Sequence, residues 1–329
     1  MTSPPQRHGA LTSGAPSAVA EREPEWVSLF NCARYHGLNL TDDQRAVRLA
    51  CEHDGRELGS LSGVITGTRF VNGHSAPFGG LDLARDRETP ANVEAIVVHA
   101  IAELEELGVD EAEVRMRPTC YSASEPLVLF TLLNHGFEVT RTELNQHVDL
   151  EGLTDVDAYL ATLRSPARRA LKHLADAGFE LREAESEADW DRAYAILAAN
   201  RAAKGRELSL SRAYVAGARV ALGSRVRMFE LHTPAGPCAA ALIYRVVPGR
   251  ELVVAWGDSG HDFERSPMNM VALRVVERAL AEGVRSLDLG ISNEPDPVAP
   301  LGVNAGLVQF KQSVGARIEP RLRLTRRIG

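Results

Sequence analysis

The stretch that decides the fold is Val284–Ala316, VRSLDLGISNEPDPVAPLGVNAGLVQFKQSVGA. Its β-branched and aliphatic residues over Arg285–Leu289 predict a short strand that ends at Gly290. A loop rich in Pro and Asp follows. The pattern then predicts a helix over Gly302–Val314, closed by Gly315. Strand, loop and helix in this order indicate an α/β protein.

One face of the predicted helix is apolar. Leu307, Phe310 and Val314 recur at three- and four-residue spacing, so we expect them to form a buried stripe. Lys311 follows Phe310 directly and lies just beyond the edge of this stripe. A cation there is expected near the carboxyl edge of the sheet, where α/β folds place their chemistry. We therefore expect this helix to decide the function.

The same stretch carries a resemblance to a known family. The pattern D-x-G … G-L-x-x-F-K-x-x-x-G-A is formed by Asp288, Gly290, Gly306, Leu307, Phe310, Lys311, Gly315 and Ala316. It resembles the Fem-type, GNAT-like acyltransferases, over nearly the whole chain after its N-terminal tail. Members carry two acetyltransferase-type domains in tandem and transfer acyl or aminoacyl groups to amines. The resemblance implies two tandem GNAT-like α/β domains, each with a mixed sheet.

Composition indicates a globular protein of ordinary type. The 329 residues are enough for two domains, with 44% hydrophobic and 25% charged residues. A formal charge of −7 argues against strong affinity for nucleic acid or an anionic membrane, although local basic patches can override this average. No apolar run approaches the roughly 20 residues that span a bilayer, and no secretory signal is recognised. We expect a cytoplasmic protein.

Metal binding is not expected from the sequence. The four cysteines, Cys32, Cys51, Cys120 and Cys238, lack CxxC spacing, and the histidines show neither HExxH nor HxH spacing. Reduced, partly buried thiols explain the cysteines best. There is also no GxSxG elbow, P-loop or Rossmann glycine run.

Element order divides the chain. Residues 1–24 are rich in Ser, Pro, Ala and Gly and are expected to be a disordered tail. Residues 25–150 alternate strands and helices in the acetyltransferase order and form the expected N-terminal domain. Residues 151–329 form the expected C-terminal domain, which repeats the pattern after a linker helix at 153–174.

The linker helix has a basic face. Arg164, Arg168 and Lys172 recur at four-residue spacing, and Arg169 broadens the face. Such a run is often only a solvated face. It could also clamp a polyanionic donor, such as a pyrophosphate or a tRNA end, or contact an acidic acceptor. The resemblance favours the last two, because the linker region of the family commonly carries a basic helix.

The resemblance also suggests catalytic residues. The family's Phe-Lys pair implies that Lys311 polarises the donor carbonyl or the developing oxyanion. Asp288 and Asp258 close their predicted strands at the same sheet edge, so either could position the amine or act as a base. The alternative for each Asp is a turn or cap role. Phe310 could pack against the donor or belong to the core.

Donor binding would fall to the loop Gly257–Asn269, which precedes a predicted helix. An N-terminus there could hold phosphates. Acyl-CoA users usually carry an R/Q-x-x-G-x-G/A loop at this place. The loop here lacks that signature but keeps Arg265 and places Ser266 and Asn269 at the start of the helix. Fem-type enzymes depart from that signature in the same way. Asn293 is a weaker candidate in the following loop.

These observations predict an N-acyltransferase. The donor is acyl-CoA or aminoacyl-tRNA, with acyl-CoA slightly favoured as the co-substrate. The acceptor is an amine of a polar small molecule or a cell-envelope precursor. A non-catalytic protein that keeps the fold and binds a ligand is the alternative from another class.

Overall fold

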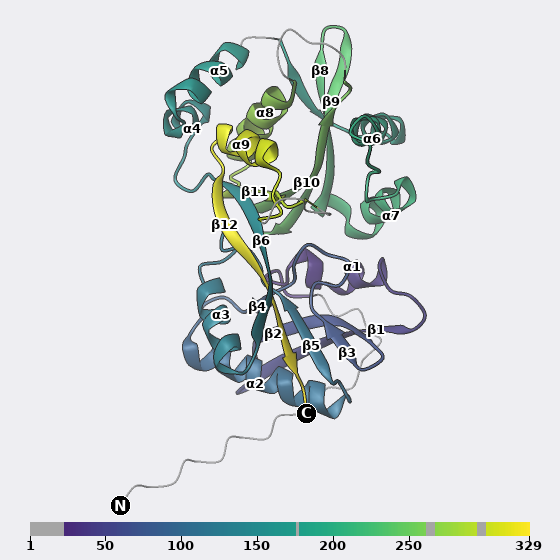
Figure 1. The fold of residues 1–329 in the computed structure, drawn as a ribbon, viewed down its shortest axis with the longest axis vertical. Helices are drawn as coiled ribbons and strands as arrows, with labels where there is room; N and C mark the ends of the chain where they lie inside the picture. Colours follow the sequence, from purple (N-terminus) through teal and green to yellow (C-terminus); the bar gives the residue numbers. More distant parts are fainter. Residues whose placement is uncertain (1–22, 176–177, 261–266, 295–300) are drawn as a thin grey trace, which may run out of the picture.

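The computed structural model describes residues 23–175, 178–260, 267–294 and 301–329, which form two lobes stacked along the long axis of the molecule (Figure 1). The elements of the first half are η1 (Leu29–Asn31), α1 (Ala33–Gly37), β1 (Gln44–His53), β2 (Arg56–Thr66), β3 (Arg69–Val71), β4 (Leu81–Leu83), α2 (Pro90–Glu106), β5 (Glu111–Arg115), α3 (Glu125–Asn134) and β6 (Glu138–Asp149). Those of the second half are α4 (Val156–Thr162), α5 (Ser165–Ala175), β7 (Glu180–Glu183), α6 (Glu187–Ala202), α7 (Arg212–Leu222), η2 (Gly223–Arg225), β8 (Val226–Thr233), β9 (Gly236–Val247), β10 (Arg250–Asp258), α8 (Pro267–Ala281), β11 (Ser286–Ile291), α9 (Ala305–Ser313) and β12 (Arg317–Arg327).

Local sequence explains where many of these elements begin and end. The Thr89 side chain accepts a hydrogen bond from Asn92 N, and Pro90 occupies the first turn of α2. Ser186 and Asp189 form a capping box at the start of α6. The hairpin between β1 and β2 turns at Asp54 and Gly55, both with positive φ. These local signals account for the starts of α2 and α6 and for the turn between β1 and β2.

One expected element differs from the observed one, and the bounds of two strands follow from the structure. The linker is two helices, α4 and α5, because Pro166 has no N–H to donate to the carbonyl of residue 162 and its ring would clash there; Pro166 lies in the first turn of α5 instead. Residues 138–149 form one long strand. The return strand β2 ends at Thr66, because Gly67 at φ +57 makes a turn into β3.

The strands of the described residues form one twelve-stranded mixed sheet. Its order is β1-β2-β3-β5-β12-β6-β11-β10-β9-β8-β7, with β4 paired to β2 beside this path. The β3–β5 and β10–β11 pairs are parallel, and the other pairs are antiparallel. The two ends of the sheet are therefore alike. Each begins with antiparallel strands and has one parallel pair, and β6 and β12 lie between the two parallel pairs.

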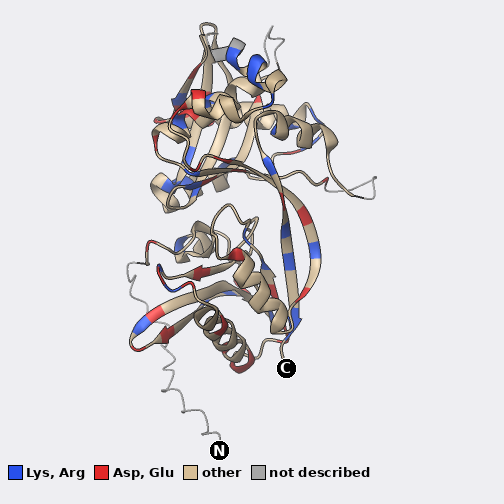
Figure 2. Cartoon of the chain, turned by 90° about the vertical axis from the view of Figure 1, so that its left-hand side faces the viewer, with Lys and Arg blue, Asp and Glu red and all other residues tan. Residues whose placement is uncertain are grey.

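The two halves exchange strands at the centre of this sheet. β12 is the last strand of the chain, yet it pairs with β5 of the first half, from Arg323 opposite Arg115 to Arg327 opposite Glu111. β6 belongs to the first half but pairs with β11 of the second. β6 and β12 also pair with each other and run along one side of the molecule from lobe to lobe (Figure 2).

Buried side chains follow the same exchange. Leu324 and Ile328, from the end of the chain, lie in the core of the first lobe with α2 and α3. A second core joins residues of both halves, including Phe30, Phe78 and Tyr244. The domain boundary expected at residue 150 stays a prediction, and these contacts tie the two halves together across it.

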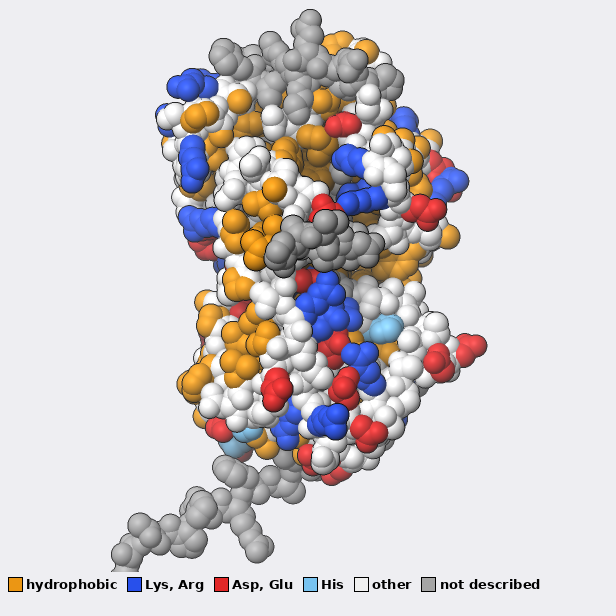
Figure 3. Space-filling view, in the orientation of Figure 1, with side chains coloured by type: hydrophobic (Ala, Val, Ile, Leu, Met, Phe, Trp, Pro, Cys, Tyr) orange, Lys and Arg blue, Asp and Glu red, His pale blue; other side chains and the backbone are white. Residues whose placement is uncertain are grey.

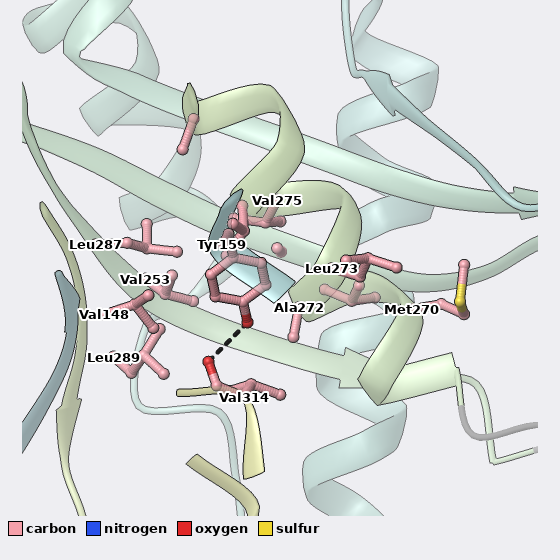
Figure 4. Packing of buried hydrophobic residues seen from close by; sticks show 14 of the residues in the cluster. Val148, Tyr159, Val253, Met270, Ala272, Leu273, Val275, Leu287, Leu289 and Val314 are labelled. Atoms are coloured by element: carbon pink, nitrogen blue, oxygen red, sulfur yellow. Dashed lines mark hydrogen bonds between the residues drawn. The ribbon is translucent and has the colours of Figure 1, made fainter. Parts of the chain in front are cut away.

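The third core surrounds α8 in the second lobe. Its Tyr159, from α4, is fully enclosed and donates a hydrogen bond of 2.8 Å to the carbonyl oxygen of Val314 (Figure 4). This bond ties α4 to the end of α9, the helix that carries Lys311. Among the described residues, no helix combines the length and apolar character needed to cross a membrane.

Candidate functional site

The pairing of β10 with β11 stops early. Only Arg250–Leu252 pair with Ser286–Asp288, although β10 continues to Asp258 and β11 to Ile291. Beyond Leu252, β10 keeps its partner β9 on the other side. Main-chain groups of β10 that face β11 therefore have no ladder partner there among the described residues. The sheet is therefore parted between the ends of β10 and β11.

The corresponding place in the first lobe is filled by the chain itself. β3 and β5 are also parallel, but the segment after β3 continues the hydrogen bonding along β5. Asn72 N donates to Glu113 O at 2.9 Å, and the amides of Gly79 and Gly80 donate to Arg115 O at 3.0 and 3.1 Å. Gly79 is required for this close approach, since a Cβ there would lie 2.4 Å from the Asn72 side chain. The opening in the second lobe is therefore the better candidate site.

Lys311 lies at the end of β11. Its Nζ donates hydrogen bonds to the carbonyl oxygens of Gly290 and Ile291, at 2.8 and 2.9 Å. The side chain is 1% exposed, so Lys311 is more buried than Leu307 or Phe310. The expectation that Lys311 lies beyond the buried stripe is wrong, because the two carbonyl acceptors allow the ammonium group to be enclosed.

Burial also changes the protonation of Lys311. Loss of hydration lowers the pKa of its ammonium group from 10.5 to about 8. The nearby Asp288 carboxylate opposes this decrease, whereas Arg321 and Arg201 add to it. Lys311 is therefore a cation at neutral pH and loses its charge as the pH rises through about 8. Two of its three N–H groups are used by the carbonyls.

The carboxylate of Asp288 accepts three hydrogen bonds. Its Oδ2 accepts from the Tyr121 hydroxyl at 2.9 Å, and its Oδ1 accepts from Asn145 Nδ2 at 2.9 Å and Gly290 N at 2.8 Å. Burial raises its pKa, and the bonds from Gly290, Asn145 and Tyr121 oppose the increase. A carboxylate that is 1% exposed and fully bonded is suited to positioning its neighbours. Sequence reasoning missed Tyr121 and Asn145, because they lie more than 140 residues before Asp288 and show no local signal.

Asp258 ends β10 on the other side of the opening. Its Oδ1 accepts from Asn200 Nδ2 at 3.2 Å and from Gly260 N at 3.1 Å, and Oδ2 makes no hydrogen bond with a described residue. Lys204 Nζ donates to Asn200 Oδ1 at 2.9 Å. Gly257 allows this close contact of α6 with β10, because a Cβ there would lie 2.7 Å from the Asn200 side chain. Asp258 is half-buried, and its Oδ2 is the oxygen that the described residues leave without a hydrogen bond.

Arg201 lies next to Asn200 on α6, and its guanidinium group makes no hydrogen bond or ion pair with any described residue. Burial lowers its pKa, and the neighbouring Arg206 lowers it further. Its charge is close enough to Lys311 to lower the pKa of that group too. A half-buried guanidinium without a partner is a candidate binder of an anionic substrate group.

The remaining predicted site residues fall into different places. Phe310 packs edge-on against Trp256, with ring centroids 5.4 Å apart, so α9 contacts β10 at this point. Asn293 Oδ1 accepts from Leu144 N at 2.7 Å, which fastens the loop after β11 to β6. Asn269 is half-buried in the first turn of α8. Arg265 and Ser266 lie outside the described residues.

Arg168 and Arg169 lie on α5, which packs against α8. Both are exposed, and neither forms an ion pair with a described residue; the same is true of Arg164 and Lys172. Lys and Arg side chains are visible at the upper left edge of Figure 3, where α4 and α5 lie in Figure 1. The basic face predicted from the sequence is thus present and solvent-exposed.

Comparison with protein families identifies part of the chain. Residues 161–296 match the family model described as the acetyltransferase (GNAT) domain. The match includes β10, β11 and the opening between them. Among curated proteins, none matches the sequence.

Solved structures resemble the chain over most of its length. The crystal structure of FemX has a TM-score of 0.70 at 10% sequence identity and covers 90% of this chain and 91% of its own. The C-terminal domain of a putative lysylphosphatidylglycerol synthetase from Agrobacterium fabrum has a TM-score of 0.53 at 15% identity, covering 86% and 84%. The structure of L-PGS from Bacillus licheniformis also has a TM-score of 0.53, at 12% identity, covering 88% and 85%. At these identities the likeness establishes the fold, and the predicted mixed α/β architecture of GNAT type is confirmed.

Proposed function

We propose that this chain, which belongs through residues 161–296 to the acetyltransferase (GNAT) domain family and shares the fold of FemX, is an N-acyltransferase with its site between β10 and β11. The observation that carries the proposal is the position of Lys311. Its ammonium group lies at the end of β11, where the sheet parts. A fixed cation at a parted sheet edge is suited to stabilising an acyl oxyanion.

The reaction needs little from the protein beyond charge and position. The amine nitrogen of the acceptor attacks the donor carbonyl carbon, and the carbonyl electron pair moves onto the oxygen. Lys311 stabilises the resulting oxyanion. Collapse of the tetrahedral intermediate breaks the bond to the leaving group, a thiolate of CoA or a ribose oxygen of tRNA. The amide product forms when the attacking nitrogen releases its proton.

Two carboxylates differ in their suitability for that proton. Asp258 has an oxygen without a hydrogen bond to described residues and lies at the end of β10, so we assign it to orienting the acceptor amine or accepting its proton. Asp288 has its hydrogen bonds filled, so we assign it to positioning. It holds Tyr121, Asn145 and the turn at Gly290 and stabilises the nearby Lys311 cation.

The first donor to test is an acyl-CoA, which the acidic net charge of −7 favours over a large nucleic acid. A second candidate is an aminoacyl-tRNA. The exposed cations of α5, which have no acidic partner among the described residues, favour this donor, because phosphate contacts supply much of the affinity for nucleic acids. The acceptor is an amine that carries an anionic group able to pair with Arg201.

The experiment incubates the full chain with a panel of acyl-CoAs and amines and follows release of free thiol. A parallel arm supplies charged tRNA with a labelled amino acid and measures transfer of the label to the amines. Activity that ribonuclease removes indicates the tRNA donor, and activity that survives ribonuclease indicates CoA. Transfer in neither arm, with ligand binding retained, would support the non-catalytic alternative.

A further inference from the structure

A cluster of metal-binding side chains lies at the junction of the two lobes, apart from Lys311. Cys120 follows β5, His147 lies on β6 and Glu319 lies on β12. One potential ligand atom from each lies within 4.8 Å of the other two. His147 is opposite Arg317 in the ladder, so Glu319 is its diagonal neighbour on the same face. The exchanged strands therefore bring these three residues together.

The potential ligand atoms of His147 and Glu319 already lie against each other. His147 Nδ1 and Glu319 Oε1 are 2.6 Å apart and form an ion pair when His147 is protonated. The other carboxylate oxygen, Glu319 Oε2, is occupied by the amide of Thr119 at 2.7 Å and by the Thr119 hydroxyl. A metal ion would replace the His147–Glu319 contact and use one atom of each residue as a ligand.

The donor set indicates which ion. Thiolate, imidazole and carboxylate together suit zinc, which commonly has three protein ligands and one open position. A tetrahedral zinc with bonds of about 2.0–2.3 Å holds its ligand atoms roughly 3.5 Å apart. The observed separations require only small side-chain movements to reach this geometry. We propose that Cys120, His147 and Glu319 bind one zinc ion, with water as the fourth ligand.

Binding has a clear chemical balance and a structural consequence. The Cys120 thiol releases its proton to solvent as the zinc–sulfur bond forms, with no change of oxidation state. The bound ion would join the segment after β5 to β6 and β12. Because Cys120 precedes Tyr121, the same ion would fix the residue that donates to Asp288. Sequence spacing hides the site, since the ligands are separated by 27 and 172 residues.

The experiment uses the full chain without an affinity tag that binds metal. After dialysis against a chelator, Co²⁺ is titrated as a spectroscopic probe and Zn²⁺ is then added in competition. We expect one equivalent of Co²⁺ with a thiolate charge-transfer band and tetrahedral visible bands, both removed by one equivalent of Zn²⁺. Cys120→Ala should abolish the charge-transfer band, and His147→Ala or Glu319→Gln should weaken binding at least about tenfold.

Matched controls separate this site from adventitious binding. Cys51→Ala removes a buried thiol of the first lobe, and His53→Ala removes an exposed imidazole; both should bind Co²⁺ as the unmodified chain does. Circular dichroism establishes that each variant is folded. The proposal is overturned if the folded chain binds less than half an equivalent, or if Cys120→Ala keeps the thiolate band. These readouts do not involve acyl transfer, so they stand whether or not the proposed activity is found.

Discussion

The hydroxyl of Tyr121 donates a hydrogen bond of 2.9 Å to Asp288 Oδ2, joining a segment of the first half to β11 in the second. Both side chains are almost fully buried. Asp288 is followed two residues later by Gly290, whose carbonyl receives Lys311. Tyr121, which lies outside the matched residues 161–296, thus supports Asp288, which lies within them.

Tyr121→Phe should destabilise the protein by about 1–3 kcal/mol, because it leaves an oxygen of a buried carboxylate without a donor. Urea denaturation measures the change in the free energy of unfolding. Tyr159→Phe is the matched control, since it removes an equally buried hydroxyl that donates to the neutral carbonyl of Val314. If Tyr121→Phe lowers the free energy of unfolding by no more than Tyr159→Phe does, the importance we assign to the Asp288 contact is contradicted.

Lys311→Met should lower kcat roughly 10²–10³-fold, because it removes a cation placed to stabilise the oxyanion. Stability should change by no more than about 2 kcal/mol. Removing a buried charge is favourable, whereas two carbonyl oxygens lose their donor, so the two effects oppose each other. Activity is measured by thiol release or label transfer, and stability by urea denaturation.

If the activity of Lys311→Met falls only in proportion to the fraction of folded protein, Lys311 is a structural residue. Lys204→Met is a useful comparison, because Lys204 is also a lysine bonded near the opening but donates to Asn200 rather than to β11. Unchanged turnover in Lys311→Met would remove the catalytic role altogether.

The rate should fall as the pH rises through about 8, the pKa to which burial lowers the Lys311 ammonium group. Lys311 is charged below that pH and neutral above it. Asp288, Arg321 and Arg201 are the charged groups whose fields it feels. Lys311→Arg keeps its charge at all these pH values, so its residual activity should lack this alkaline decrease. The pH profiles of kcat for the two proteins test this.

The same titration affects folding. Unfolded Lys311 keeps its proton to about 10.5, so between pH 8 and 10.5 the unfolded chain binds more protons than the native one. The stability contribution of Lys311 therefore rises with pH through that window and is least favourable below pH 8. The difference in unfolding free energy between the unmodified chain and Lys311→Met should change by on the order of 3 kcal/mol between pH 7 and 11. A pH-independent difference would contradict the lowered pKa.

Leu324→Ala should destabilise the first lobe by about 2–5 kcal/mol, although residue 324 is near the end of the chain. Its fully buried side chain packs with residues of α2 and β5. Hydrogen exchange should show lost protection in β5 and α2. Leu301→Ala, at a residue that is 81% exposed, should stay within about 0.5 kcal/mol. Loss of protection confined to the second lobe would be inconsistent with the exchange of strands.

Arg168→Ala combined with Arg169→Ala should raise the KM for an aminoacyl-tRNA at least tenfold, with kcat little changed, if α5 contacts the tRNA. The same variant should leave the KM for a short acyl-CoA unchanged. Arg45→Ala with Arg85→Ala removes two exposed arginines of the first half as a control for net charge. An unaltered KM for tRNA would reduce the basic face to a solvated surface.

Much of the fold could be predicted because its signals are local. Pro90 and Thr89 mark the start of α2, and alternating hydrophobic residues mark the strands of the meander β8–β9–β10. The strand β12 was not expected, because its sequence RIEPRLRLTRR contains Pro320 and many charges. Ion pairs across the strands accommodate those charges. An example is Arg321 with Glu143, whose partner lies 178 residues away in the sequence.

The candidate site shows the same division. Lys311 and Phe310 could be recognised as a pair from a resemblance, and Asp258 from its place at a strand end. Their surroundings could not, since Tyr121 and Asn145 reach Asp288 only through the exchanged strands. The burial of Lys311 was also not foreseen, because it depends on carbonyl groups of Gly290 and Ile291 that helix periodicity does not report.

The place of β12 has a consequence for biosynthesis. A ribosome releases the first lobe's other strands long before it reaches Arg317–Arg327, so during translation the edge of β5 that β12 will cover waits unpaired. An open edge of this kind invites pairing with other chains. The nascent first lobe thus depends on residues that are synthesised after the second lobe, and a chain that stopped before Arg317 would lack the strand that lies between β5 and β6.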